Sequence, residues 1–115
     1  MFRFESLEIW KRSADVALTL FDLADKLEAR KLFRFADQLR GAALSAPNNI
    51  AEGSGSTSQR DFANFLNIAR RSVFETASMV LVFDRRGFLD VGQKEALLNE
   101  LDELCRMITA FARTL

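Results

Sequence analysis

The stretch QLRGAALSAPNNIAEG, residues 38–53, combines a run of small helix-forming residues with the only proline of the chain. Pro47 cannot donate a hydrogen bond to the carbonyl of Ala43, and its ring crowds that carbonyl. A helix here should therefore bend, at a cost of about 3 kcal/mol unless it is compensated. The side chains of Ser45 and Asn49 can bond to nearby backbone groups. These residues predict a helix that is kinked at Pro47.

The small side chains before Pro47 should allow a neighbouring helix to approach closely. Asn49 and Glu52 are then expected to form hydrogen bonds across to Ser72 or Glu75 on the next helical segment. The stretch is thus predicted to be a kinked helix contact that is fastened by polar side chains.

Apolar residues recur every three or four positions on both sides of this stretch, which is the period of amphipathic helices. Four such segments cover residues 6–28, 33–52, 58–86 and 91–114, and no strand pattern occurs. Short connections between helices with one apolar stripe each favour an antiparallel up-and-down bundle. We therefore predict an all-α fold, a four-helix bundle in a single domain that spans residues 1–115.

The spacing also predicts which side of each helix faces inward. The expected inward residues of the first helix are Leu7, Trp10, Ala14, Ala17, Phe21 and Ala24. Those of the second helix are Phe35, Leu39, Ala42, Ala43, Ala46 and Ile50. Helix caps are expected at Ser6, Ser58 and Asp90. Residues 53–56 (GSGS) are expected to form a flexible loop.

The composition excludes several classes of protein. The 16 basic and 16 acidic residues cancel, so any basic surface must be local. With no histidine and only Cys105, the chain lacks the usual transition-metal ligands and cannot form an internal disulfide. No stretch has the length of a signal peptide core or of a membrane span. We expect a cytoplasmic protein without metal, cofactor or membrane.

Charge is distributed unevenly along the chain. Residues 1–29 and 90–115 each carry a net charge of minus two, whereas residues 30–59 and 60–89 each carry plus two. Either neighbouring helices or subunits have complementary charges, or the two central helices form a basic surface for nucleic acid. The candidate nucleic-acid-binding residues are Lys31, Arg34, Arg40, Arg60, Arg70 and Arg71.

Glu52 and Glu75 offer a possible catalytic pair, because glycosidase and general acid–base chemistry uses two nearby carboxyl groups. The chain has no histidine to accompany them. A structural polar network is the favoured interpretation, and a hydrolase that uses these two residues is the remote alternative.

Residues 38–53 resemble the signature motif of a known protein family. A segment of the type Q-L-R-R-A-x-x-S-x-P-x-N-I-A-E-G closes the second helix of proteins first described as products of intervening sequences in bacterial large-subunit rRNA genes. The opening LEIWKRS and the positions Phe65, Leu66, Ile68 and Ala69 are also similar to that family. The motif residues that the resemblance singles out are Arg40, Ser45, Pro47, Asn49, Glu52, Ser72 and Glu75. Gly41 departs from a commonly basic position, and Arg71 stands where a glycine is usual.

The resemblance implies a four-helix bundle and a homo-oligomer, most often a pentameric ring or barrel. A relative, the accessory variability determinant of diversity-generating retroelements, binds a reverse transcriptase and nucleic acid. The resemblance thus implies a non-enzymatic adaptor that binds RNA or DNA, a reverse transcriptase, or both. The alternative is a purely structural protein–protein assembly module with no nucleic-acid binding.

Large apolar residues outside the four stripes also favour an oligomer, because one small bundle cannot readily cover them all. These residues are Phe2, Phe4, Ile9, Phe33, Phe74, Phe88 and Leu89.

Overall fold

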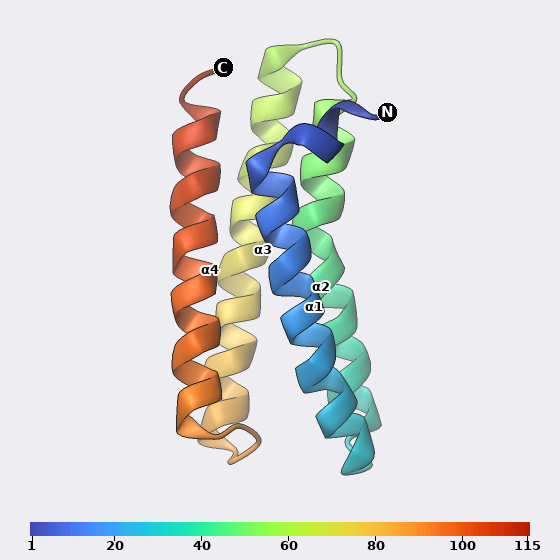
Figure 1. Cartoon of the computed structure of the whole chain (residues 1–115), viewed down its shortest axis with the longest axis vertical. Coiled ribbons are helices and arrows are strands. Elements are labelled where there is room, and N and C mark those ends of the chain that lie inside the picture. Colours follow the sequence, from blue (N-terminus) through green and yellow to red (C-terminus); the bar gives the residue numbers. More distant parts are fainter.

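The computed structural model describes residues 1–115, which fold into four antiparallel α-helices without any strand. The helices are α1 (Glu8–Ala29), α2 (Phe33–Ser54), α3 (Gln59–Arg85) and α4 (Val91–Ala112), preceded by a 3-10 turn, η1 (Arg3–Ser6). Both termini and the α2–α3 connection lie at one end of the molecule, and the other two connections lie at the opposite end (Figure 1). The predicted all-α four-helix fold is confirmed.

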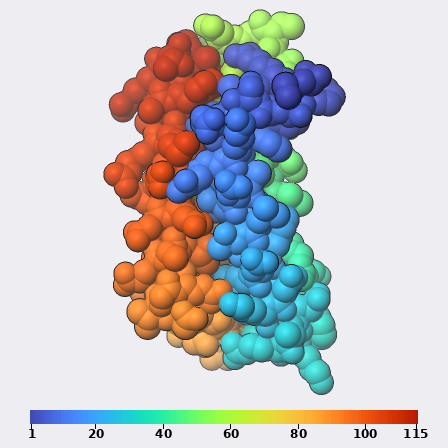
Figure 2. All heavy atoms as spheres, viewed as in Figure 1, coloured from blue at the N-terminus to red at the C-terminus, as the bar shows by residue number.

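The helices are packed in the order in which they occur in the chain. α1 with α2 and α2 with α3 form the most extensive contacts, α3 with α4 fewer, and α4 with α1 the fewest. The molecule is elongated, 44 × 22 × 19 Å, and α1 and α4 cover the face drawn in Figure 2. None of the helices is sufficiently long and apolar to cross a membrane.

The buried side of α1 differs from the predicted stripe. Leu7, Trp10 and Phe21 are only half-buried at the edge of the core. Ala17 and Ala24 are buried as predicted. The other buried residues of α1 are spaced by three and four from another starting point: Ile9, Ser13, Val16, Leu20, Leu23 and Leu27. The larger aliphatic side chains fill the interior, while the rings pack along its margin. Ile9, which is 4% exposed, is therefore not available to a partner.

The buried side of α2 largely follows the prediction. Leu39, Ala43, Ala46 and Ile50 are buried, whereas Ala42 is half-buried. The remaining predicted residue, Phe35, is 39% exposed. It packs against Phe83 and Phe88 at the end of the bundle, so it does not reach the core between the helices.

Two of the three predicted helix caps are confirmed. The Ser58 hydroxyl accepts a hydrogen bond from the backbone N–H of Asp61 at 3.2 Å, and the Asp90 carboxylate accepts one from the N–H of Gln93 at 2.7 Å. The predicted Ser6 cap is wrong. Ser6 belongs to η1 and donates to the carbonyl of Arg3, and α1 begins only at Glu8.

The second helix is longer than predicted. α2 continues through Pro47 and ends at Ser54, so Gly53 and Ser54 are buried helical residues and the connection begins at Gly55. The prediction of a flexible loop over residues 53–56 is therefore wrong in its first half. A bend at Pro47 stays a prediction.

Candidate interaction surfaces

A line of hydrogen bonds joins α2 to α3 at the level of the motif. The hydroxyls of Ser45 and Ser72 lie 2.7 Å apart, and Ser72 donates to the carbonyl of Ile68 at 3.0 Å. Because a hydroxyl has one proton, Ser45 is the donor between the two serines. Asn49 donates to the Ser45 carbonyl at 2.8 Å and points its amide at the Ser45 hydroxyl at 3.3 Å. The chain of bonds thus runs from Asn49 through both serines to the backbone of α3.

The structure corrects the predicted partners across this contact. Asn49 bonds within its own helix, and Glu52 is an exposed residue without a hydrogen bond to α3. Seven residues separate Glu52 from Ser45, which places it two turns away from the serine bridge. The bridge is formed by Ser45, whose short side chain sits at the point where the two helices face each other.

Gly53 explains how the two helices come so close. A Cβ atom added to Gly53 would lie 2.5 Å from the Cβ of Phe65 and 3.0 Å from a ring carbon of Phe62. The Cβ of Phe65 is tied to its backbone and cannot swing aside. The glycine that closes the motif therefore allows α2 and α3 to touch, and it does not end the helix.

The geometry does not support Glu52 and Glu75 as a catalytic pair. Starting from the bridged Ser45 and Ser72, Glu52 lies seven residues towards one end and Glu75 three residues towards the other. At a rise of 1.5 Å per residue, the two positions are roughly 15 Å apart along the bundle. Paired glycosidase carboxyls are about 5–9.5 Å apart.

Arg40, the arginine of the motif, binds acidic residues of α1 and α2. Its guanidinium donates to Asp25 at 2.8 Å, to Glu28 at 3.1 Å and to Asp37 at 3.3 Å. The hydrogen bonds that Arg40 donates to Asp25 and Glu28 raise the pKa of its guanidinium. Because the pKa of Arg40 is higher in the folded than in the unfolded protein, its contribution to stability is fully present below the unfolded-state pKa. That contribution is lost only as the pH rises through the folded-state pKa, in strong alkali. Arg40 therefore joins α1 to α2, and its charge is shared by three carboxylates.

The six predicted nucleic-acid-binding residues do not form one strip. Lys31 and Arg34 lie at the end of the bundle opposite the termini, whereas Arg60 lies on the first turn of α3, at the other end (Figure 1). Arg71 is exposed without an ion pair near the middle of α3. Arg70 donates to the Thr109 hydroxyl at 3.0 Å. Charge counted by segment did not separate these residues, because it does not consider which end of the bundle each one occupies.

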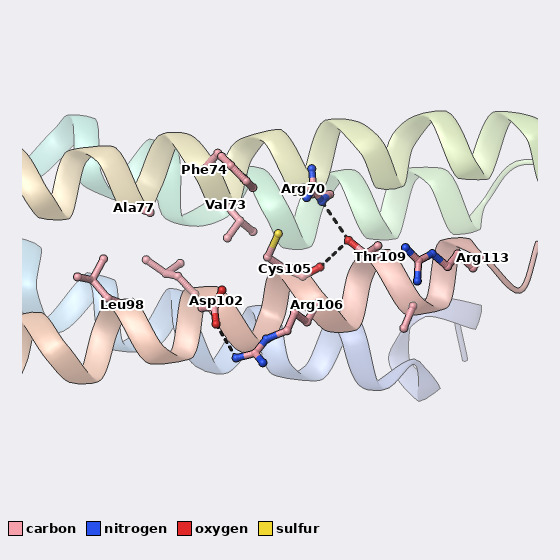
Figure 3. Close-up of a pocket in the computed structure, with 12 residues that line it drawn as sticks. Arg70, Val73, Phe74, Ala77, Leu98, Asp102, Cys105, Arg106, Thr109 and Arg113 are labelled. Atoms are coloured by element: carbon pink, nitrogen blue, oxygen red, sulfur yellow. Dashed lines mark hydrogen bonds and ion pairs between the residues drawn. The ribbon is translucent and has the colours of Figure 1, made fainter.

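The largest cavity of the molecule is an open groove of 610 Å³ between α3 and α4 (Figure 3). Apolar side chains such as Val73, Leu98 and Leu101 form much of its lining. Three arginines surround it: Arg70, Arg106 and Arg113. The apolar periodicity does not predict this groove, which depends on how α3 and α4 pack against each other.

The polar contacts around the groove hold two of these arginines in place. The Arg70 guanidinium lies over the ring of Phe74 at 5.0 Å in addition to its bond to Thr109. Arg106 pairs with Asp102 on the next turn of α4 (Figure 3). A smaller cavity of 280 Å³ shares Arg70, Thr109 and Arg113 and extends the groove towards the end that holds the termini. The face is thus an open apolar groove, with three arginines and Asp102 along its rim.

Exposed apolar side chains lie beside this groove and on α1. Phe74, at the edge of the groove, is 59% exposed, and Leu81 and Val82 follow it on α3. On α1, Leu18 is 60% exposed and stands between the exposed Asp15 and Asp22. Neither aspartate forms an ion pair. The outer face of α1 therefore presents an apolar group flanked by free acidic groups.

Comparisons with known proteins agree on the family and the fold. The model of the 23S rRNA-intervening sequence protein family matches residues 5–110. A crystal structure of a protein with unknown function from the S23 ribosomal protein family of Bacteroides thetaiotaomicron is similar, with a TM-score of 0.85 and 25% identity. The match covers 90% of this chain and 97% of that chain. No curated protein matches the chain.

Proposed function

The chain belongs to the 23S rRNA-intervening sequence protein family, and we propose that it is a non-enzymatic adaptor that assembles into a homo-oligomer and binds nucleic acid. The observation that carries the proposal is the basic-rimmed apolar groove between α3 and α4, together with exposed Phe74 beside it. Open apolar surface of this kind is typical of protein–protein contacts. Neither comparison names an enzymatic activity.

The same chain carries a surface that complements the groove. Leu18 on α1 supplies an apolar group, and Asp15 and Asp22 supply negative charges on either side of it. The groove supplies an apolar floor and a rim that includes Arg106 and Arg113. Because the two surfaces lie on different parts of one subunit, the contact is head-to-tail, and such contacts close into rings when the rotation between subunits allows it. We propose a five-fold ring.

Light scattering or sedimentation at micromolar protein concentration tests the assembly. A mass of about five chains supports the five-fold ring. A mass of another small number of chains supports the assembly but contradicts the number five. A strict monomer would contradict the assembly proposal, because a groove of this kind would then have no second copy to cover it.

Nucleic-acid binding is supported by exposed basic residues without ion-pair partners, including Lys31, Arg34, Arg60 and Arg71. A ring repeats these charges, so a chain of zero net charge can still present a concentrated positive surface. Binding should be weakly sequence-specific and should fall steeply with salt, since roughly 0.9 counterion is released per phosphate contact on duplex DNA. A reverse transcriptase is the proposed protein partner.

Titration of labelled RNA and DNA at low and moderate salt tests this half of the proposal. Affinity that falls with salt supports it. No binding at low salt would leave the alternative, an assembly module that contacts only proteins. The remote alternative, a hydrolase using Glu52 and Glu75, has little support because the two residues lie at different levels of the bundle.

A further inference from the structure

Basic residues gather at the end of the bundle opposite the termini, where the α1–α2 and α3–α4 connections lie side by side (Figure 1). We call this surface the basic end. Residues 30–36 and 84–90 contain only two acidic residues, Asp84 and Asp90. The basic residues of the basic end number five: Arg30, Lys31, Arg34, Arg85 and Arg86. Only two of these were among the residues predicted from the sequence.

The positive charge of the basic end is not neutralised within the subunit. None of its five basic residues forms an ion pair. Asp84 pairs with Lys94 at 3.3 Å, and Asp90 accepts the backbone N–H of Gln93. Glu28 and Asp37, the next acidic residues along the chain, both bind Arg40. The nearby acidic groups are therefore occupied by other partners.

Three phenylalanine rings form the apolar part of the same end. The centroids of Phe35, Phe83 and Phe88 lie 5.7–6.0 Å from one another. The Arg30 guanidinium lies over the Phe88 ring at 5.2 Å. An open cavity of 330 Å³ is bounded by these rings together with Val82, Arg85 and Arg86. Aromatic faces and arginine side chains thus line one hollow.

We infer that the basic end binds single-stranded nucleic acid, with the arginines on phosphates and a base stacked against Phe35 in the aromatic cavity. The inference rests on the proposed nucleic-acid binding and gives it a location and a substrate class. Single strands bind where a positive surface follows the backbone and aromatic rings offer stacking faces. Four of the five basic residues are arginines, whose planar guanidinium matches phosphate geometry.

The shape of the basic end favours a nucleic acid over two other anionic partners, a membrane surface and an acidic peptide. Phe33 and Val82 are exposed at this end and could approach a membrane surface, but the aromatic cluster itself is recessed, with Phe83 buried and Phe88 half-buried in a hollow. A flat planar group can enter such a hollow and lie against a ring. An acidic peptide would use the charges and leave the aromatic faces unused.

The test is fluorescence anisotropy of a labelled 20-nucleotide poly(U) RNA with the full chain, from 50 to 200 mM salt. Arg85→Gln with Arg86→Gln removes two phosphate contacts, so the salt slope should fall by about 1.4, at about 0.7 per contact on single strands. The matched control is Lys11→Gln with Arg12→Gln, which removes the same charge from two neighbouring residues at the other end of the bundle and should leave the slope unchanged. Circular dichroism verifies that each variant folds.

A second pair of variants tests the stacking. Phe35→Leu keeps an apolar side chain but removes the ring, and it should weaken RNA binding about fivefold or more. Phe2→Leu makes the same change on an exposed ring at the other end of the bundle and should leave the affinity unchanged.

The outcomes separate this inference from the proposed function. If the RNA binds and the Arg85/Arg86 variant keeps the wild-type salt slope, the basic end is not the site, although nucleic-acid binding stands. If Phe35→Leu binds as tightly as the wild type, the inference is also wrong. Phosphatidylserine vesicles or poly-glutamate bound as tightly as the RNA would likewise overturn it. Absence of RNA binding at 50 mM salt would overturn both proposals.

Discussion

The two sides of α3 are built differently. Towards α2, the helices touch at Gly53 and share the Ser45–Ser72 bridge. Towards α4, the helices leave a groove of 610 Å³ with a basic rim. The family motif thus lies at the closed contact, where its residues hold the bundle together. The proposed interaction surfaces lie elsewhere, so a strong sequence motif here indicates the fold and does not locate those surfaces.

The largest expected effect comes from a methyl group added at the closed contact. Gly53→Ala would place its Cβ 2.5 Å from the Phe65 Cβ, so the helices must move apart. Overpacking of a core costs about 1–3 kcal/mol, and we expect destabilisation of that order in urea unfolding.

Gly41→Ala is the matched control in the same helix. Nothing lies within 4 Å of the added Cβ, and Gly41 is exposed. Alanine should therefore stabilise α2 by about 0.5–1 kcal/mol. If both substitutions change stability in the same direction, the α2–α3 contact is not closed in the way described.

Removing the serine bridge should have a smaller effect. Ser45→Ala and Ser72→Ala should each cost about 1 kcal/mol, the usual value for one hydrogen bond. The double variant should cost less than the two single losses together, because both remove the same bond. Strict additivity in urea unfolding would show that the two hydroxyls do not interact.

Loss of the Arg40 ion pairs should have the smallest effect. Arg40→Gln removes bonds to three exposed carboxylates, which are weak individually and are screened by salt. The thermal midpoint should fall slightly at low salt and approach that of the wild type at about 1 M salt. Arg12→Gln, which removes the single pair with Glu103, is the control and should have a lesser effect. A loss independent of salt would assign Arg40 a packing role.

The sequence predicts much of this fold, because each helix has a clear apolar period and two of its caps are correct. It predicts the position of side chains around a helix less well. Large apolar residues occur on two adjacent sides of α1. The spacing predicts that Leu7 and Trp10 face inward, whereas Ile9 and Leu20 are the buried residues. Asn49 is predicted to reach across to α3, but its amide instead bonds to the carbonyl of Ser45 one turn back in α2.

The candidate surfaces depend on relations that one sequence does not contain. The basic end exists because two connections far apart in the chain lie at the same end of the bundle (Figure 1). Assigning each connection of an up-and-down bundle to its end would have added Arg30, Arg85 and Arg86 to the predicted Lys31 and Arg34. The groove has no such signal, since it depends on how far α3 and α4 diverge.

The central claim is that the outer face of α1 docks in the α3–α4 groove of another subunit. A charge exchange between these two surfaces tests it most directly. Asp15→Arg with Asp22→Arg should repel the groove and lower the mass measured by light scattering to that of a monomer. Adding Arg106→Glu and Arg113→Glu should restore the wild-type mass, because the charges become complementary again. If the first variant keeps the wild-type mass, or the second fails to recover it while remaining folded, α1 does not dock in the α3–α4 groove.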